Sequence, residues 1–205
     1  MLTLDNITCI RGGKLLFRHL GLTVGDCCLV AVTGANGSGK SSILRIMAGL
    51  LRPTEGTVLY ANEPIDGEYA LEYCDILHYI GHKSGLNGYM TVRENLTFWA
   101  ALRGNVNAML GAALHFFELE AVQDVPVGRL SMGWQKRVTL ARLLLRQSEI
   151  WLLDEPYAYL DAQGSRLLDG LIQARIDQGG SVVIATNDTI TLPGCYELAL
   201  GEFQS

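Results

Sequence analysis

The sequence predicts an α/β fold with a parallel-sheet core, an antiparallel β layer and an inserted α-helical subdomain. Three features of the 205-residue chain support this prediction. Short apolar runs of strand length alternate with helical segments, residues 1–30 form alternating strands, and residues 91–146 change to a period of 3.6. We therefore expect one domain over residues 1–205, with a helical lobe at about residues 83–146 inserted in the core.

The antiparallel layer comes first in the chain. Strands are predicted at residues 2–8 and 15–24, with the turn at 11–13 between them. A buried strand follows at 28–33, and apolar residues at helical spacing predict a helix over 41–51. The later strands are expected at 57–61, 76–80, 150–154, 181–185 and 197–200, and the later helices at 91–103, 106–117, 131–146 and 162–178.

Composition limits the classes of protein to which the chain can belong. With 49% hydrophobic and 18% charged residues, it can bury roughly 70% of its unfolded surface. It has no apolar stretch of about 18 residues or more and no basic segment before an apolar one at its start. We therefore expect neither a membrane-spanning helix nor a signal peptide. We also expect the protein to be located in the cytoplasm. The net charge of -5 argues against broad binding to DNA or RNA, which needs clustered Lys and Arg.

The cysteines give no sign of a metal site. They form no CxxC pair, and no histidine lies at zinc-ligand spacing from them. We expect reduced core thiols at Cys9, Cys27, Cys28, Cys74 and Cys195.

Residues 34–41 read Gly-Ala-Asn-Gly-Ser-Gly-Lys-Ser, a complete GxxxxGK(S/T) loop between a predicted strand and a predicted helix. Glycines let backbone N–H groups turn toward phosphates, Lys40 supplies a cation for the β- and γ-phosphates, and Ser41 offers a hydroxyl to Mg²⁺. A glycine-rich turn before an ordinary helix is the alternative, but both flanking elements favour an ATP site of the P-loop NTPase class. The residues expected to bind the nucleotide are Gly34, Ala35, Asn36, Gly37, Ser38, Gly39, Lys40, Ser41 and Ser42.

A second acidic site follows the apolar run at residues 150–153. Successive strand residues point to opposite sides, so Asp154 and Glu155 can do different work at the strand end. We assign Asp154 to the Mg²⁺ shell and Glu155 to the water that attacks the γ-phosphate. A solvated corner is the alternative, and the complete phosphate loop makes it the weaker interpretation.

The run Leu-Ser-Met-Gly-Trp-Gln-Lys-Arg at residues 130–137 resembles the LSGGQ signature of ATP-binding cassette (ABC) proteins. Alone, Leu-Ser-x-Gly is an ordinary helix cap, but here it lies 20 residues before the acidic strand. The resemblance covers essentially the whole chain and implies an ABC-ATPase fold that pairs head to tail as a homodimer in the ATP state. It also implies that Ser131 and Gly133 contact the γ-phosphate on a second copy and that Asp161 belongs to the D-loop at 158–161.

Four positions depart from the general pattern of the family. The switch histidine is replaced by Asn187, which can hydrogen bond to a phosphate but cannot take up a proton, so we expect slower hydrolysis. The Q-loop glutamine is replaced by His82, which can still act on Mg²⁺ through water, although a surface histidine without a role is the alternative. Trp134 replaces the fifth signature residue and is either an interface residue or core filling. Arg11 stands where many cassettes stack an aromatic ring on adenine, and it is either a stacking group or a solvated turn residue.

Residues 79–96 resemble the corresponding run of the cytochrome c maturation ATPases, in which a histidine at position 82 is usual. This resemblance implies a peripheral protein at the cytoplasmic face of the inner membrane, beneath membrane subunits of the CcmB and CcmC type. ATP hydrolysis would then energise haem export or release of the haem-loaded chaperone CcmE. The chain has no CxxCH motif, so haem would be handled by the partners.

Three other functions stay open from the sequence. One is the ATPase subunit of another small ABC transporter. Another is a slowly hydrolysing regulatory ATP switch, because of Asn187 and Trp134. A third is a soluble cassette that acts on ribosomes or DNA, but the chain has neither a second fused cassette nor a coiled-coil insertion. We expect no nucleic-acid partner.

Overall fold

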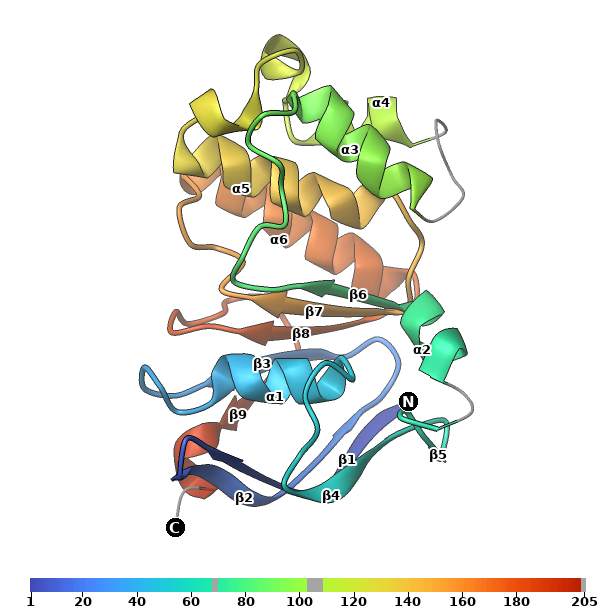
Figure 1. The fold of residues 1–205 in the computed structure, drawn as a ribbon, viewed down its shortest axis with the longest axis vertical. Helices are drawn as coiled ribbons and strands as arrows, with labels where there is room; N and C mark the ends of the chain where they lie inside the picture. The colour runs from blue at the N-terminus through green and yellow to red at the C-terminus, as the bar shows by residue number, and fades with distance from the viewer. Residues whose placement is uncertain (68–69, 103–108, 204–205) are drawn as a thin grey trace. The chain divides into compact units, whose positions relative to one another are not determined.

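The computed structural model describes residues 1–67, 70–102 and 109–203. The predicted helix end at Arg103 and the predicted start of the next helix at residues 106–108 lie outside the described residues. The chain divides into two compact units (Figure 1). The first unit contains residues 1–82, 148–155 and 173–205, and the second contains residues 83–147 and 156–172.

The first unit contains a five-stranded parallel sheet in the order β6-β7-β8-β3-β9. Every residue of β7 and β8 is buried, which explains why these strands are apolar runs without alternation. The carboxyl ends of β3, β7 and β8 lie at one edge of this sheet. The bounds are β3 Leu29–Thr33, β6 Leu77–Ile80, β7 Ile150–Asp154, β8 Ser181–Ala185 and β9 Cys195–Ala199.

An antiparallel sheet in the order β2-β1-β4-β5 forms another layer of the first unit. The β1–β2 hairpin pairs Leu2 with Val24 at one end and Arg11 with Lys14 beside the turn. Helix α1 (Lys40–Met47) lies between this sheet and the parallel one, as Figure 1 shows. The bounds are β1 Leu2–Arg11, β2 Lys14–Val24, β4 Glu55–Tyr60 and β5 Glu63–Pro64.

Apolar side chains from all three layers form one core in the first unit. Phe17 of β2, Leu44 and Met47 of α1, and Leu152 of β7 are each fully buried there. Helix α2 (Ala70–Ile76) joins this core through Tyr73, whose hydroxyl donates a 2.6 Å hydrogen bond to the Met47 carbonyl. This packing holds α1 and the loop that precedes it against the parallel sheet.

The second unit is helical. Helix α3 (Val92–Ala101) begins with a capping box, in which the Thr91 and Glu94 side chains each accept from the other residue's backbone N–H. The part of α6 up to Ile172 belongs to this unit. The other helices are α4 Leu110–Phe116, α5 Met132–Ala141, α6 Ala162–Asp177 and the short 3₁₀ turns η1 Glu120–Val122, η2 Val127–Arg129 and η3 Arg142–Leu144.

Several predicted boundaries are wrong, each for a local reason. The helix predicted to end at Leu51 ends at Met47, because Gly49 turns to a φ of 69° and its N–H bonds to the Ile46 carbonyl. The helix predicted to reach Arg146 leaves the α conformation at Ala141 and tightens into η3. Helix α2, strand β5 and the 3₁₀ turns, including η4 (Leu200–Phe203), were not predicted.

The prediction that all five cysteines are core thiols is also wrong. Cys9 is buried, but Cys27 and Cys74 are exposed, and Cys28 and Cys195 are half-buried. Among the described residues, no helix is both long enough and apolar enough to cross a bilayer.

Candidate functional site

The phosphate loop joins the end of β3 to the start of α1 in the first unit. Gly39, the residue before α1, has a φ of 110°, and a Cβ there would lie 2.9 Å from the Phe17 ring. Only glycine therefore fits against this ring. No side-chain hydrogen bond caps the start of α1, so its first N–H groups are available as donors for an anion.

Lys40 crosses the loop and is buried, with 7% of its surface exposed. Its Nζ donates to the Gly34 carbonyl at 2.7 Å, to the Ala35 carbonyl at 3.3 Å and to Asn187 Oδ1 at 2.7 Å. All three acceptors are neutral, so the ammonium charge is solvated by dipoles and not by a carboxylate. A buried cation in this state attracts phosphate strongly.

Ser41 and Asp154 provide hard oxygen ligands side by side. The Ser41 Oγ donates to Asp154 Oδ1 at 3.1 Å, and Asp154 is 2% exposed at the end of β7. Mg²⁺ prefers oxygen ligands and retains several waters, so one hydroxyl and one carboxylate fit its needs. Burial, followed by the charge of Asp154, raises the pKa of Tyr79 on the neighbouring strand, which keeps that phenol neutral.

His82, predicted to act on Mg²⁺, is an exposed residue just after β6. Within the described residues, no hydrogen bond joins it to Ser41 or Asp154. Its role stays a prediction.

Glu155 takes an uncommon backbone conformation, with a φ of 46°. Its N–H donates to the Ala185 carbonyl at 2.8 Å, which fixes the residue between the ends of β7 and β8. Its Oε1 accepts a 3.4 Å hydrogen bond from Asn187 Nδ2. The carboxylate therefore lies in the same cluster as the phosphate loop, as the sequence predicts for a catalytic base.

Asn187 connects the parts of this cluster. Its carbonyl accepts from Lys40, while its Nδ2 donates to Asn36 Oδ1 at 3.0 Å and to Glu155. One amide thus contacts the predicted phosphate clamp, the loop and the predicted base. The sequence predicts that Asn187 can hydrogen bond to a phosphate, which stays a prediction, and the structure adds that both ends of the amide are used.

The signature segment lies in the second unit. Ser131 caps α5, with its Oγ accepting from the Trp134 N–H at 3.4 Å. A Cβ at Gly133 would lie 2.9 Å from the Tyr159 carbonyl, so glycine lets the D-loop segment approach α5 closely. Met132 and Tyr159 leave 53% and 64% of their surfaces exposed beside these residues.

Arg137 holds the D-loop segment to α5, and the sequence did not identify it. Its guanidinium pairs with Glu118 and Asp161 at 2.9 Å each and stacks 5.1 Å from the Trp134 ring centroid. Trp134 is therefore a platform for a buried cation. The Gly164 N–H and then Arg137 hold the pKa of Asp161 below its usual value. The described contacts of Asp161 are thus with its own chain, and its nucleotide role stays a prediction.

Two other predicted residues have few contacts in the described structure. Arg11 is exposed and pairs in register with Lys14 beside the hairpin turn, so adenine stacking stays a prediction. Ser38 is 5% exposed, and its buried Oγ has no hydrogen-bond partner among the described residues. A buried hydroxyl of this kind fits a loop that is completed by a phosphate.

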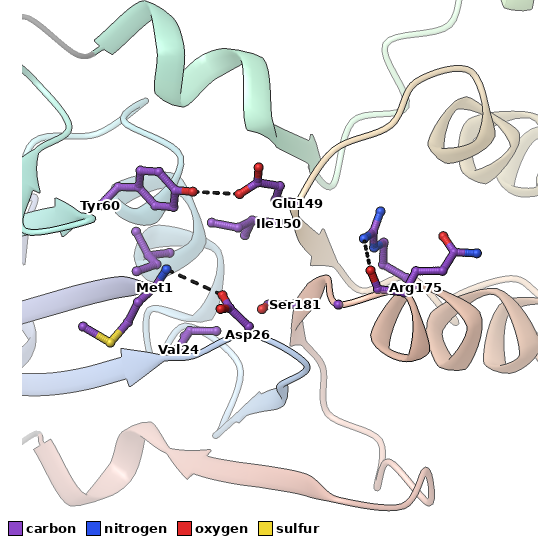
Figure 2. A pocket seen from close by; sticks show the side chains of 11 residues that line it. Met1, Val24, Asp26, Tyr60, Glu149, Ile150, Arg175 and Ser181 are labelled. Atoms are coloured by element: carbon purple, nitrogen blue, oxygen red, sulfur yellow. Dashed lines mark hydrogen bonds and ion pairs between the residues drawn. The ribbon is translucent and has the colours of Figure 1, made fainter.

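A cavity of about 240 Å³ lies at the opposite ends of the same strands (Figure 2). It is lined by Ile150 and Ser181, the first residues of β7 and β8, and by the charged Asp26, Glu149 and Arg175. Burial and the 2.7 Å hydrogen bond to Glu149 raise the pKa of the lining Tyr60 to about 12. None of the predicted site residues lines this cavity, so it is separate from the predicted nucleotide site.

The chain is similar to known proteins over most of its length. Residues 17–158 match the ABC transporter family. The cytochrome c biogenesis ATP-binding export protein CcmA of Pseudomonas putida is 40% identical, over 96% of this chain and 95% of its own. The protein of the same name from Aliivibrio fischeri is 39% identical, over 98% of this chain and 100% of its own.

Solved structures are similar over most of the chain. A dimeric bacterial ABC transporter cassette has a TM-score of 0.83 and 25% identity, over 98% of this chain and 95% of that chain. A dimeric cassette in a post-hydrolysis state, bound to ADP and Pi, has a TM-score of 0.81 and 26% identity, over 92% of this chain and 88% of that chain.

Proposed function

Because the chain belongs to the ABC transporter family, we propose that it is the ATP-hydrolysing cassette of a cytochrome c maturation complex. The observation that carries the ATPase assignment is the cluster in which Asn187 joins Lys40 to Glu155, beside the Ser41–Asp154 pair. Phosphate clamp, metal ligands and base thus meet at the carboxyl ends of three neighbouring strands. The two compact units together form one nucleotide-binding domain.

ATP is held by the loop before α1. The N–H groups of residues 34–42 and the Lys40 ammonium bind the phosphates, and Arg11 stacks on the base. Ser41 and Asp154 would hold Mg²⁺, which would supply positive charge to the phosphates of the bound ATP, and His82 would act on it through water. The neutral acceptors around Lys40 support this assignment, because they leave its charge available to the phosphates.

Hydrolysis is assigned to Glu155, which orients the attacking water and accepts its proton. Asn187 orients that carboxylate and Lys40, but its amide transfers no proton. The reaction is therefore slower than in cassettes with a histidine at this place. This amide is also the observation that favours the second candidate, a slowly hydrolysing regulatory switch.

In the ATP state, two copies pair head to tail. Ser131 and Gly133 of one copy face the γ-phosphate held by the other, and Asp161 lies in the segment next to them. The exposed Met132 and Tyr159 support a contact surface here. The dimer sits at the cytoplasmic face of the inner membrane beneath subunits of the CcmB and CcmC type, and hydrolysis energises haem export or release of haem-loaded CcmE.

The experiment that tests this function uses a tagged Glu155→Gln protein, in which hydrolysis is blocked and the ATP dimer persists. Membranes of the source organism are solubilised with Mg-ATP, and bound proteins are identified by mass spectrometry. We expect CcmB- and CcmC-like membrane proteins. Recovery of a different permease would show that the chain is the ATPase subunit of another ABC transporter. Recovery of ribosomal or DNA-repair proteins would reject the transport function.

A further inference from the structure

The cavity of Figure 2 lies wholly within the first unit, because every residue that lines it belongs to that unit. Its volume of about 240 Å³ is below the range of about 300–1,000 Å³ that is usual for drug-sized ligands, so it suits a smaller molecule. Part of its lining is buried and apolar, with one side chain each from β1, β2 and β7: Leu2, Val24 and Ile150. An apolar lining with a few charged side chains is the usual composition of a small-molecule site.

Arg175, near the end of α6, brings a guanidinium with few partners to this cavity. Its Nη2 donates one long hydrogen bond, 3.4 Å, to the Gln178 carbonyl. Its Nε is buried and has no hydrogen-bond partner among the described residues. No carboxylate pairs with this arginine in the part of the chain that the structure describes. Most of its N–H donors, and its charge, are therefore available to an acidic group.

The turn after α6 is shaped around this guanidinium. A Cβ at Gly180 would overlap Arg175 Nε and would lie 2.6 Å from Arg175 Cζ. Gly179, with a φ of 92°, reverses the chain here, and the Gly180 N–H donates to the Arg175 carbonyl at 3.0 Å. The arginine side chain therefore lies over Gly180, in space that only glycine leaves empty.

Glu149 brings the opposite charge to the same cavity. Its Oε2 accepts a 2.7 Å hydrogen bond from the Tyr60 hydroxyl, which holds the carboxylate but adds no positive charge. Its backbone carbonyl accepts from the Ser181 N–H at 2.8 Å. Among the described residues no cation pairs with Glu149, whereas the Met1 ammonium lies 3.7 Å from the neighbouring Asp26, as Figure 2 shows. Glu149 is therefore the carboxylate that is free to bind a cation.

A guanidinium and a carboxylate thus border one cavity without pairing with each other (Figure 2). We propose that this cavity binds a small zwitterion, whose acidic group pairs with Arg175 and whose ammonium pairs with Glu149. The stem between the two charges is apolar, because it lies against the apolar lining. This chemistry describes an amino acid with its charges at opposite ends of the chain. The site goes beyond the proposed function, because no residue assigned to ATP lines the cavity.

The first test is isothermal titration calorimetry of the full-length protein with γ-aminobutyrate and ε-aminocaproate, two zwitterions of different length. Caproate and hexylamine, which carry one charge each, are the control ligands. We expect saturable binding in the millimolar range for at least one zwitterion, about tenfold or more tighter than for either control, because each control forms only one of the two charged contacts. The inference is wrong if neither zwitterion binds, or if a control binds as tightly.

The second test removes each charge in turn. We expect Arg175→Met and Glu149→Gln each to weaken zwitterion binding about tenfold, the scale of one lost charged hydrogen bond. The matched controls are Arg52→Met and Glu72→Gln, at exposed positions of the same unit that do not line the cavity. Both controls should bind as the wild type does. Wild-type affinity in both cavity variants would overturn the inference.

A third variant moves the guanidinium without removing it. Gly180→Ala fills the space that Arg175 occupies, so it should weaken binding as Arg175→Met does, and combining the two changes should weaken binding no further. Gly170→Ala on α6 is the control, because a Cβ there meets nothing within 4 Å. Melting temperatures close to that of the wild type in Glu149→Gln and Arg175→Met would show that lost binding is not lost structure. Additive effects of the changes at 175 and 180 would contradict the proposed contact.

Discussion

Asn187 hydrogen-bonds to Lys40 and Glu155, two groups that the proposed reaction needs. We predict its effect on the rate of ATP hydrolysis and on the pH dependence of that rate. Removing its amide in Asn187→Ala takes one hydrogen bond from Lys40 and one from Glu155, so we expect hydrolysis to fall roughly 10²-fold. The change Asn187→His introduces a side chain that titrates. The rate of ATP hydrolysis should therefore rise above that of the wild type and should depend on pH, with a midpoint at about pH 6.5. Phosphate release measured from about pH 5.5 to about pH 8.5 checks both. Wild-type activity in Asn187→Ala would contradict the positioning role.

The sequence predicted some residues of the candidate site and missed others. Lys40, Ser41, Asp154 and Glu155 follow from short motifs, because their chemistry depends on neighbours in the chain. Arg137 and its partners could not be predicted this way. Its contacts with Glu118 and Asp161 join residues 19 and 24 positions away, and a basic residue in a helix usually indicates a solvated face. The one available signal was its place at the end of the run at residues 130–137 that resembles the signature.

Helix α3 provides the prediction at the scale of an element. Its capping box satisfies two backbone N–H groups at the helix start, so Thr91→Ala should lower the free energy of unfolding by about 1 kcal/mol. Thr97→Ala is the matched control, because the same change within the helix removes no cap. Urea denaturation followed by circular dichroism measures both. Equal stability of the two variants would show that the box contributes nothing.

The same box bears on any test of membrane association that reverses a charge on α3. A charge reversal at Glu94 would break the cap, because its Oε2 accepts from the Thr91 N–H at 2.8 Å. Arg93 contacts Gln123 and lies 4.0 Å from Asp124, so its reversal disturbs only exposed pairs. Membrane association is therefore better tested at Arg93.

Element type was predictable, but several element ends were not. Strands β7 and β8 were predicted with their observed bounds, because a short apolar run flanked by polar residues has few alternatives. The α1 helix ends earlier than its apolar pattern, because Leu50 and Leu51 continue the spacing after Gly49 has reversed the chain. Helix α2 has one buried residue, Tyr73, and so little periodicity to detect.

At the scale of the whole molecule, the chain divides into two compact units, and the single domain with an inserted lobe stays a prediction. The second unit holds residues 83–147, close to the predicted 83–146, but it also includes 156–172. The predicted lobe did not include that segment. Tertiary contacts such as Arg137 to Asp161 place it with the helices instead. The order of elements along the chain could not predict this grouping, because the contact joins residues that are 24 positions apart.

In the proposed function, this cluster of residues hydrolyses ATP with Glu155 as the base. The most direct measurement is phosphate release by purified wild type, Glu155→Gln and Asp188→Asn at the same Mg-ATP concentration. Asp188→Asn is the matched control, because it removes one negative charge from an exposed carboxylate beside Asn187. We expect Glu155→Gln to lose roughly 10²-fold or more, with Asp188→Asn close to the wild type. Wild-type turnover in Glu155→Gln would contradict the account.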